Sequence, residues 1–411
     1  MVDAELNPQG ISRADLAVCI LSHHEADSLI HSARQASEGL GKYFPDKQSV
    51  LINFDNNSAV NTKEVFFGTH TEVPKISLSA SIGAEGSENH FRNLFRKVTE
   101  LGARGIIVVD TALKHVTPEW IKRLGEPLFN GFSYVAPLYI GRRHDGTITN
   151  AIAYPLFRAL FGRRIRQPMG NEFGFSGDLA RIYGESPGWD MAVTDYGNHM
   201  WMATVALTHG ARVCQSFMGS AGIKKGEDPS GSLAPRFEQD LEAIFFLMNR
   251  FESHWLGVRY SRPTAVVGFG ENAVEASYNS SVDTQSLFVG FQDGFSCFEP
   301  LWEEVFAKDV FLKLREIKGM EQNVFDFPTE LWARILYEMS VACRDRGKDS
   351  DRLIRSLIPL FSGKTFCFLK KTSSMAPHQI EGVIEEDCMI FEMTKPYLVK
   401  RWTEGHRPAS P

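Results

Sequence analysis

Two aspartates stand directly after apolar, strand-like segments of the chain. Asp55 ends the run SVLINFD, which starts at residue 49, and Asp110 ends the run RGIIVVD, which starts at residue 104. Nearly continuous apolar runs of this length are typical of strands that are covered on both faces. In parallel sheets, ligands bind beyond the carboxyl ends of the strands. The positions of Asp55 and Asp110 therefore make both carboxylates candidates for a binding site.

The segments around these aspartates alternate between strand and helix patterns. Between the first two strands, for example, Leu29, Ala33 and Ala36 recur at helical spacing. Such alternation predicts right-handed βαβ units and an α/β fold with a mostly parallel sheet flanked by helices. The predicted strands cover 15–22, 49–58, 73–79 and 104–112, and the predicted helices cover 23–44 and 91–103.

The later part of the chain divides into less regular regions. Between 131 and 215 the pattern is mixed, and two stretches there, 142–152 and 165–177, are rich in Gly, Asn and charged residues, as functional loops often are. Residues 237–256 have the pattern of an amphipathic helix. The predicted organisation is an α/β domain over 1–255, a linker or extended arm over 256–285, and a helical C-terminal domain over 286–411.

Composition narrows the class of protein. The chain has 411 residues, 44 Lys+Arg against 50 Asp+Glu, and 43% hydrophobic residues, so it can bury a large core. A net charge of −6 argues against a nucleic-acid partner, which would need a clustered basic surface. No run reaches the roughly 18 apolar residues of a membrane span, and the N-terminal residues lack a signal-peptide pattern. We therefore predict a cytoplasmic protein with no membrane span.

Three features that suggest other chemistry are weak. The six cysteines show no CxxC spacing, which predicts buried thiols without a disulfide framework or zinc site. His23 and His24 have no third metal ligand at a recognisable spacing. The segment Gly268-Phe-Gly270-Glu-Asn-Ala273 fits a dinucleotide fingerprint, but the run before it is too short for the buried strand that this motif requires. A dehydrogenase function would depend on this segment alone.

An ordered series of motifs extends along the chain. These are LSHHEAD, NFDNNS, IGAEGSEN, VVDTALKHVTPEW, RRHDGTITN, RQPMGNEFGFSG, DYGNHMWM and KPYLVKRW. Together they resemble A-type glycosyltransferases, and more closely the retaining mannosylglycerate, glucosylglycerate and glucosyl-3-phosphoglycerate synthases, from about Asp15 to Trp402. The resemblance implies a nucleotide-sugar-binding A-type fold with a helical C-terminal extension. It also implies transfer of a hexose to a small hydroxy acid such as glycerate, a divalent cation (Mg²⁺ or Mn²⁺) as cofactor, and a homodimer.

The resemblance assigns roles to individual residues. Glu25 and Asp55 match positions that hold the base and ribose, and a carboxylate suits either contact; for Asp55 the alternative is an Asx turn that caps the strand. The acceptor-binding residues that it implies are Arg142, Arg143, Thr147, Thr149, Gln167, Gly170 and Glu172. The two guanidinium groups suit a bidentate grip on a carboxylate or phosphate. The nearby run Arg163, Arg164 and Arg166 is interpreted as a solvated basic stretch.

The sequence departs from the family's pattern at the donor site. The Asp-x-Asp that holds the cation appears as Asp110-Thr111-Ala112, the basic Gly-Lys-Gly as Ala84-Glu85-Gly86, the Gly-x-Asp as Gly197-Asn198-His199, and the later metal-binding histidine as Lys224 or Lys225. The ligand set for a divalent cation is therefore incomplete, and we assign no metal ligand. In addition, Glu85 places a carboxylate where the family has the lysine of Gly-Lys-Gly, whose ammonium group faces the diphosphate.

Two hypotheses follow from these departures. In the first, transfer is metal-independent: Lys224 or Lys225 supplies the positive charge beside the diphosphate, Asp110 binds the donor, and His199 contacts the donor or assists the acceptor. In the second, the protein is a catalytically inactive pseudo-glycosyltransferase that binds a ligand or pairs with an active homologue. The helical C-terminus is the expected dimer surface.

Overall fold

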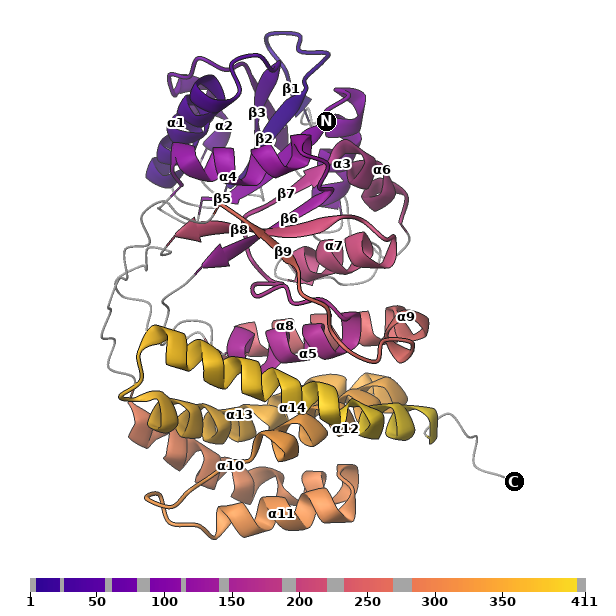
Figure 1. Cartoon of the computed structure of the whole chain (residues 1–411). Helices are drawn as coiled ribbons and strands as arrows, with labels where there is room; N and C mark the ends of the chain where they lie inside the picture. The colour runs from indigo at the N-terminus through magenta and orange to yellow at the C-terminus, as the bar shows by residue number, and fades with distance from the viewer. Residues whose placement is uncertain are drawn as a thin grey trace. The chain divides into compact units, whose positions relative to one another are not determined.

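The computed structural model describes residues 5–22, 26–55, 61–79, 89–111, 116–139, 148–186, 197–219, 233–268 and 283–404. Within these ranges the strands are β1 (Glu5–Leu6), β2 (Leu16–Ser22), β3 (Ser49–Asp55), β4 (Lys75–Ser79), β5 (Gly105–Asp110), β6 (Tyr134–Tyr139), β7 (Phe173–Ser176), β8 (Val213–Gly219) and β9 (Ala265–Val267). They form one sheet in the order β1-β4-β3-β2-β5-β7-β6-β8-β9 (Figure 1).

Most neighbouring strands of this sheet are parallel. The strands β4, β3, β2 and β5 form one parallel block, and β6, β8 and β9 form another. The strand β7 joins the two blocks and is antiparallel to both of its neighbours, and β1 adds an antiparallel edge beside β4. The predicted α/β class with a mostly parallel sheet is therefore confirmed, and the four predicted strands correspond to β2, β3, β4 and β5.

Helices cover both faces of the sheet (Figure 1). They are α1 (Ala26–Tyr43), α2 (Thr62–Gly68), α3 (Asn89–Glu100), α4 (Pro118–Phe129), α6 (Gly177–Glu185) and α7 (Gly197–Thr208). Apolar residues of α1, α2 and α4 pack on one face in a core that includes Val18, Ile107 and Trp120. On the other face, aromatic rings of α3 and α6 pack against the strands, as Phe95 does against Phe175. We call these the α4 face and the α3 face.

The chain forms two compact units. The sheet unit comprises Met1–Ile140, Arg166–Glu227 and Thr264–Glu275, and the helical unit comprises Gly141–Ile165, Asp228–Pro263 and Ala276–Pro411. These limits differ from the predicted domain limits at 255 and 286. The predicted arm over 256–285 contains β9, which pairs with β8 in the sheet. The helix α8 (Leu233–Arg250) was expected in the first domain but lies in the helical unit. Hydrophobic periodicity predicts a helix but does not show which core the helix joins.

The helical unit confirms the helical C-terminal region. Besides α8, its described elements are the π-helix η1 (Thr149–Ala153), α5 (Tyr154–Phe161), α9 (Glu252–Leu256), α10 (Thr284–Val305), α11 (Lys308–Lys318), α12 (Thr329–Arg346), the 3₁₀-helix η2 (Gly347–Asp349), α13 (Ser350–Thr372) and α14 (Pro377–Glu404). The helices α10 and α13 pack closely, because Gly294 leaves room for Pro359 where a Cβ would lie 2.1 Å from its Cγ. The helix α13 was not predicted as a separate element.

A buried arginine connects α5 to α14 within the helical unit. The Arg158 side chain is 1% exposed and forms ion pairs with Glu385 and Glu392. Its Nε also donates to Ser261 Oγ at 3.1 Å, and the Ser261 backbone N–H donates to Glu392 at 3.1 Å. Burial raises the pKa of Glu392, but hydrogen bonds from Ser261 and Arg158 outweigh it and the net pKa is lowered. A buried charge with two partners is strongly destabilising when one side is removed.

Other features of the described residues complete this picture. None of the described helices is long and apolar enough to span a membrane. The cysteines are free thiols, and four of them are buried as predicted, but Cys297 is exposed and Cys367 half-buried. The prediction of buried thiols is therefore wrong for Cys297, which lies on the outer side of α10.

Candidate functional site

The parallel block of the sheet changes its winding direction between β2 and β5. After β2 the chain passes through α1 on the α4 face to β3, whereas α3, which precedes β5, packs on the other face. The strand β2 therefore has β3 on one side and β5 on the other. In open α/β sheets the crevice beyond the carboxyl ends of the strands at such a switch point is where ligands bind. This edge is the candidate site.

Both predicted aspartates lie at this edge. Asp55 is in register with Ser22 on β2, and Asp110 is in register with Leu21. Because β3 and β5 lie two strand spacings apart, the two aspartates are separated by about 10 Å along the sheet. Residues in register share a face and successive residues alternate, so Asp55 lies on the α4 face and Asp110 on the α3 face. The two carboxylates thus flank β2 without meeting.

Asp110 has a neutral neighbour in the segment just before β7. The Asn171 side-chain Nδ2 donates to Asp110 Oδ2 at 3.1 Å. The pairing follows from the sheet, because Val108 is in register with Phe173 and two further residues bring Asp110 opposite Asn171. Asp110 is only 6% exposed. Asn171 was not predicted as a site residue, since its partner is 61 residues away and only the strand pairing brings the two together.

His199 lies on the same face of the sheet as Asp110. It is in the first turn of α7 and is 4% exposed. Its ring centroid is 5.1 Å from that of Phe173 on β7 and 6.3 Å from that of Phe91 on α3. The structure thus places His199 in an aromatic environment beside β7, and its predicted role with the donor or acceptor stays a prediction.

Glu172 lies on the opposite face. It is buried and accepts a hydrogen bond from the Tyr139 hydroxyl at the end of β6, and the Tyr139 ring packs against Trp120 of α4. The pleat that aims Asn171 toward the α3 face sends Glu172 toward the α4 face. Glu172 therefore belongs to a polar contact under α4, and no local sequence pattern indicates its Tyr139 partner.

The loop before β7 is held close to β6. Gly170 closes a turn in which its N–H donates to the Gln167 carbonyl at 3.2 Å. A Cβ at Gly170 would lie 2.4 Å from Pro137 Cγ, so only glycine fits without movement of β6. The Gln167 side-chain Oε1 is buried with no hydrogen-bond partner among the described residues. Gly170 thus has a packing role in addition to any contact with an acceptor, and Gln167 keeps a free acceptor atom.

The interpretation of 163–166 as a solvated basic stretch is wrong for Arg166. Its side chain is buried, and its backbone N–H donates to Gln215 Oε1 on β8 at 2.6 Å. Gln215 is itself buried and interrupts the apolar pattern of β8, which explains why that strand was not predicted. Arg163 and Arg164 are half-buried and bond to Pro263 and Ser261 in the helical unit.

The remaining predicted residues are not all in the sheet unit. Thr149 begins η1 in the helical unit, where its carbonyl accepts the Tyr154 N–H. Two residues further, the Ala151 carbonyl accepts from the Trp332 indole at 2.8 Å, which fixes this π-helix to α12. The predicted residues Glu25, Arg142, Arg143, Thr147, Lys224 and Lys225 lie outside the described residues, as do Ala112 and Glu85.

The described residues around Asp110 do not fit a divalent cation. No group of three or more His, Cys, Asp or Glu side chains that could hold a metal occurs in the described ranges. Asp110 has an amide donor beside it, and the next residue, Thr111, is buried and carries no carboxylate. Hard cations such as Mg²⁺ prefer several oxygen ligands, of which one or two are carboxylates. We therefore assign no chemistry to a metal ion at this edge.

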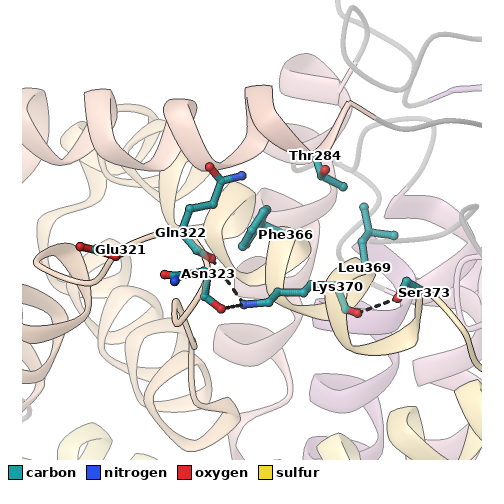
Figure 2. A pocket seen from close by; sticks show the side chains of 8 residues that line it. All are labelled: Thr284, Glu321, Gln322, Asn323, Phe366, Leu369, Lys370 and Ser373. Carbon is teal, nitrogen blue, oxygen red and sulfur yellow. Dashed lines mark hydrogen bonds between the residues drawn. The ribbon is translucent and has the colours of Figure 1, made fainter.

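A cavity of about 720 Å³ lies in the helical unit (Figure 2). Its lining residues are Thr284, Glu321, Gln322, Asn323, Phe366, Leu369, Lys370 and Ser373. The Lys370 ammonium group donates to the Asn323 carbonyl at 2.5 Å and to the Gln322 carbonyl at 3.4 Å. The one cation of the lining thus holds the turn after α11, and none of the predicted site residues lines this cavity.

Comparisons with known proteins give similarity only at the level of structure. No model of a protein family matches the chain, and no curated protein matches it. Among solved structures, glucosyl-3-phosphoglycerate synthase from Mycobacterium tuberculosis in complex with Mn²⁺, UDP and glucosyl-3-phosphoglycerate is 17% identical, covers 58% of this chain and 80% of that chain, and has a TM-score of 0.42. The same synthase with phosphoglyceric acid is 16% identical, with the same coverage and TM-score.

A third solved structure, described as a mycobacterial protein, is 18% identical, covers 58% of this chain and 74% of that chain, and has a TM-score of 0.43. The sequence identities and TM-scores of all three structures are low. The function of this chain is therefore argued from its own residues.

Proposed function

We propose that this protein transfers a hexose from a nucleotide sugar to a small hydroxy acid such as glycerate, with retention of anomeric configuration. In this reaction the bond between the anomeric carbon and the diphosphate oxygen breaks, and a bond to the acceptor hydroxyl oxygen forms on the same face of the sugar. The hydroxyl proton passes to the departing diphosphate. The leaving group is then a nucleoside diphosphate.

The observation that carries this proposal is the position of Asp55 and Asp110 on either side of β2 at the switch point of the sheet. This is the edge at which α/β proteins bind nucleotides. The Asp55 carboxylate is half-buried at the end of β3 and suits hydrogen bonds from a base N–H or ribose hydroxyl. Asp110 at the end of β5 suits a second hydroxyl or the sugar. The proposed ligand is therefore a nucleotide carrying a sugar.

The acceptor class rests on the motif that includes Arg142 and Arg143, whose guanidinium groups suit a carboxylate or phosphate. In this proposal they hold the hydroxy acid by its charged group. Lys224 or Lys225 supplies the positive charge beside the diphosphate. His199, which lies in the aromatic environment beside β7, contacts the donor or assists the acceptor.

A second candidate is a binding protein without transferase activity. The observation that favours it is the chemistry at Asp110, whose carboxylate accepts from the Asn171 amide and is followed in the sequence by Thr111 and Ala112. Loss of a second carboxylate is compatible with loss of catalysis while nucleotide binding persists. The two candidates share the ligand and differ in turnover, so one experiment separates them.

The test incubates the purified protein with UDP- and GDP-hexoses and with glycerate or 3-phosphoglycerate, with chelator and with Mn²⁺. Release of nucleoside diphosphate measures turnover, and proton NMR of the product reports its anomeric configuration. We expect a retained product and at least a tenfold loss of turnover in Asp110→Asn. The matched control is Asp178→Asn on α6, whose side chain is 81% exposed and which should behave as the native protein.

Nucleotide binding without release of nucleoside diphosphate from any donor would favour the binding protein. An inverted product would contradict the retaining mechanism. Turnover that Asp110→Asn leaves unchanged would place the reaction elsewhere in the molecule.

A further inference from the structure

We propose that Asn171 disfavours the binding of a divalent cation at Asp110. Its amide donates a hydrogen bond to the Asp110 carboxylate and occupies the position beside it that such a cation would need. The inference rests on the proposed function in taking a nucleoside diphosphate as the ligand, and it adds how this chain binds that ligand without Mg²⁺ or Mn²⁺. It concerns two described residues, Asp110 at the end of β5 and Asn171 in the segment before β7.

The geometry of the pair is set by backbone pairing. The strands β5 and β7 are antiparallel with Val108 opposite Phe173, so Asp110 and Asn171 extend the same register and point to the same face. Their side chains meet at 3.1 Å between Nδ2 and Oδ2. Asn171 lies two residues before β7 and continues its register, and Asp110 is only 6% exposed. The amide is therefore a fixed neighbour of this carboxylate.

The chemistry of the pair disfavours a cation at that oxygen. An ionised carboxylate only accepts hydrogen bonds, so Asn171 must present its NH₂ group to Asp110. A Mg²⁺ ion binds carboxylate oxygen at about 2.1 Å. At Asp110 Oδ2 it would share that oxygen with an N–H dipole whose positive end points at the ion. Cation binding would thus require the loss of the hydrogen bond and rotation of the amide.

The triplet that begins at Asp110 carries one carboxylate. It is Asp110-Thr111-Ala112, and Thr111 is buried with its N–H bonded to the Leu21 carbonyl at 3.0 Å. The Asn171 amide oxygen becomes a neutral ligand for a hard cation only when the hydrogen bond to Asp110 is broken. Asn171 thus adds to the effect of the alanine, although it precedes a different strand.

The experiment measures Mn²⁺ binding without nucleotide, by the electron paramagnetic resonance signal of free Mn²⁺. The proteins compared are the native chain, Asp110→Asn, Asn171→Asp, and the double variant Asn171→Asp with Asp110→Asn. The matched control is Asn61→Asp, which adds the same charge at the exposed N-cap of α2, where aspartate is equally suitable. Circular dichroism confirms that each variant is folded.

We expect Asn171→Asp to bind Mn²⁺ at least tenfold more tightly than the native chain, the double variant to lose this gain, and Asn61→Asp to match the native chain. Native binding of Mn²⁺ that Asp110→Asn abolishes would overturn the proposal, as would a folded Asn171→Asp with no gain. If Asn171→Asp does not fold, Asn171→Gly with Ala112→Asp removes the amide and restores the second carboxylate, and the same gain is expected.

This result is independent of nucleotide binding. Failure of the proposed function would appear as absence of nucleotide binding or turnover, whereas failure of the present inference would appear in the Mn²⁺ signal alone. The two failures are therefore distinguishable.

Discussion

Asn171 Nδ2 lies 3.1 Å from Asp110 Oδ2, across the antiparallel pair of β7 and β5. This contact joins the end of the central strand of the sheet to the loop that carries Gln167 and Gly170. It gives the carboxylate a neutral partner at the edge where a nucleotide would bind. The contact therefore connects the departure from Asp-x-Asp, which the sequence shows, to a physical consequence for cation binding.

Replacing Gly170 by alanine tests the close approach of its loop to β6. A Cβ there would lie 2.4 Å from Pro137 Cγ, and overpacking of this kind costs about 1–3 kcal/mol. We expect Gly170→Ala to lower the melting temperature by several degrees. The control is Gly68→Ala in α2, where a Cβ meets no atom within 4 Å and stability should be unchanged or slightly raised. Equal melting temperatures for the two variants would contradict this expectation and show that β6 moves away from the added Cβ at little cost in stability.

The buried Arg158 should be far more important for stability than an exposed arginine. Arg158→Met leaves Glu392 and Ser261 without their buried partner, which predicts a loss of about 3–5 kcal/mol in the free energy of unfolding. In Arg181→Met, which removes an exposed pair with Asp178 on α6, we expect a loss of less than about 1 kcal/mol. Urea titration measures both. A small effect for Arg158→Met would mean that the Glu385 and Glu392 carboxylates are hydrated in the variant.

Asp240 on α8 predicts a pH dependence of stability. Burial, opposed by Arg236, raises its pKa from 3.8 to about 7. Because the folded state binds this proton more tightly than the unfolded state does, the contribution is fully present below about pH 4 and is lost as pH rises through 7. The pKa difference corresponds to about 4 kcal/mol.

The variant Asp240→Asn removes this titration. We expect its stability relative to the native protein to rise between pH 5 and pH 8, as measured by urea unfolding at each pH. The exposed Asp293→Asn on α10 serves as the control and should leave the pH profile unchanged. A native profile that Asp240→Asn does not alter would mean that the Asp240 carboxylate is hydrated.

The parallel block could be predicted because its strands are apolar runs separated by helical patterns. The strands β7 and β8 could not: β7 has only four residues, and β8 contains the buried polar residues Gln215 and Ser216. Asp55 and Asp110 were identified from their place after strands. Asn171 was not, because its role arises from strand pairing over 61 residues, which a local pattern does not contain.

Calorimetric titration of the native protein with UDP and with GDP, each with Mn²⁺ and with chelator, tests the central claim most directly. The account predicts binding of at least one of the two nucleotides at the β2–β5 edge, with an affinity that changes less than threefold when chelator replaces Mn²⁺ and that falls at least tenfold in Asp110→Asn. Binding that requires Mn²⁺, or no binding of either nucleotide under both conditions, would contradict it.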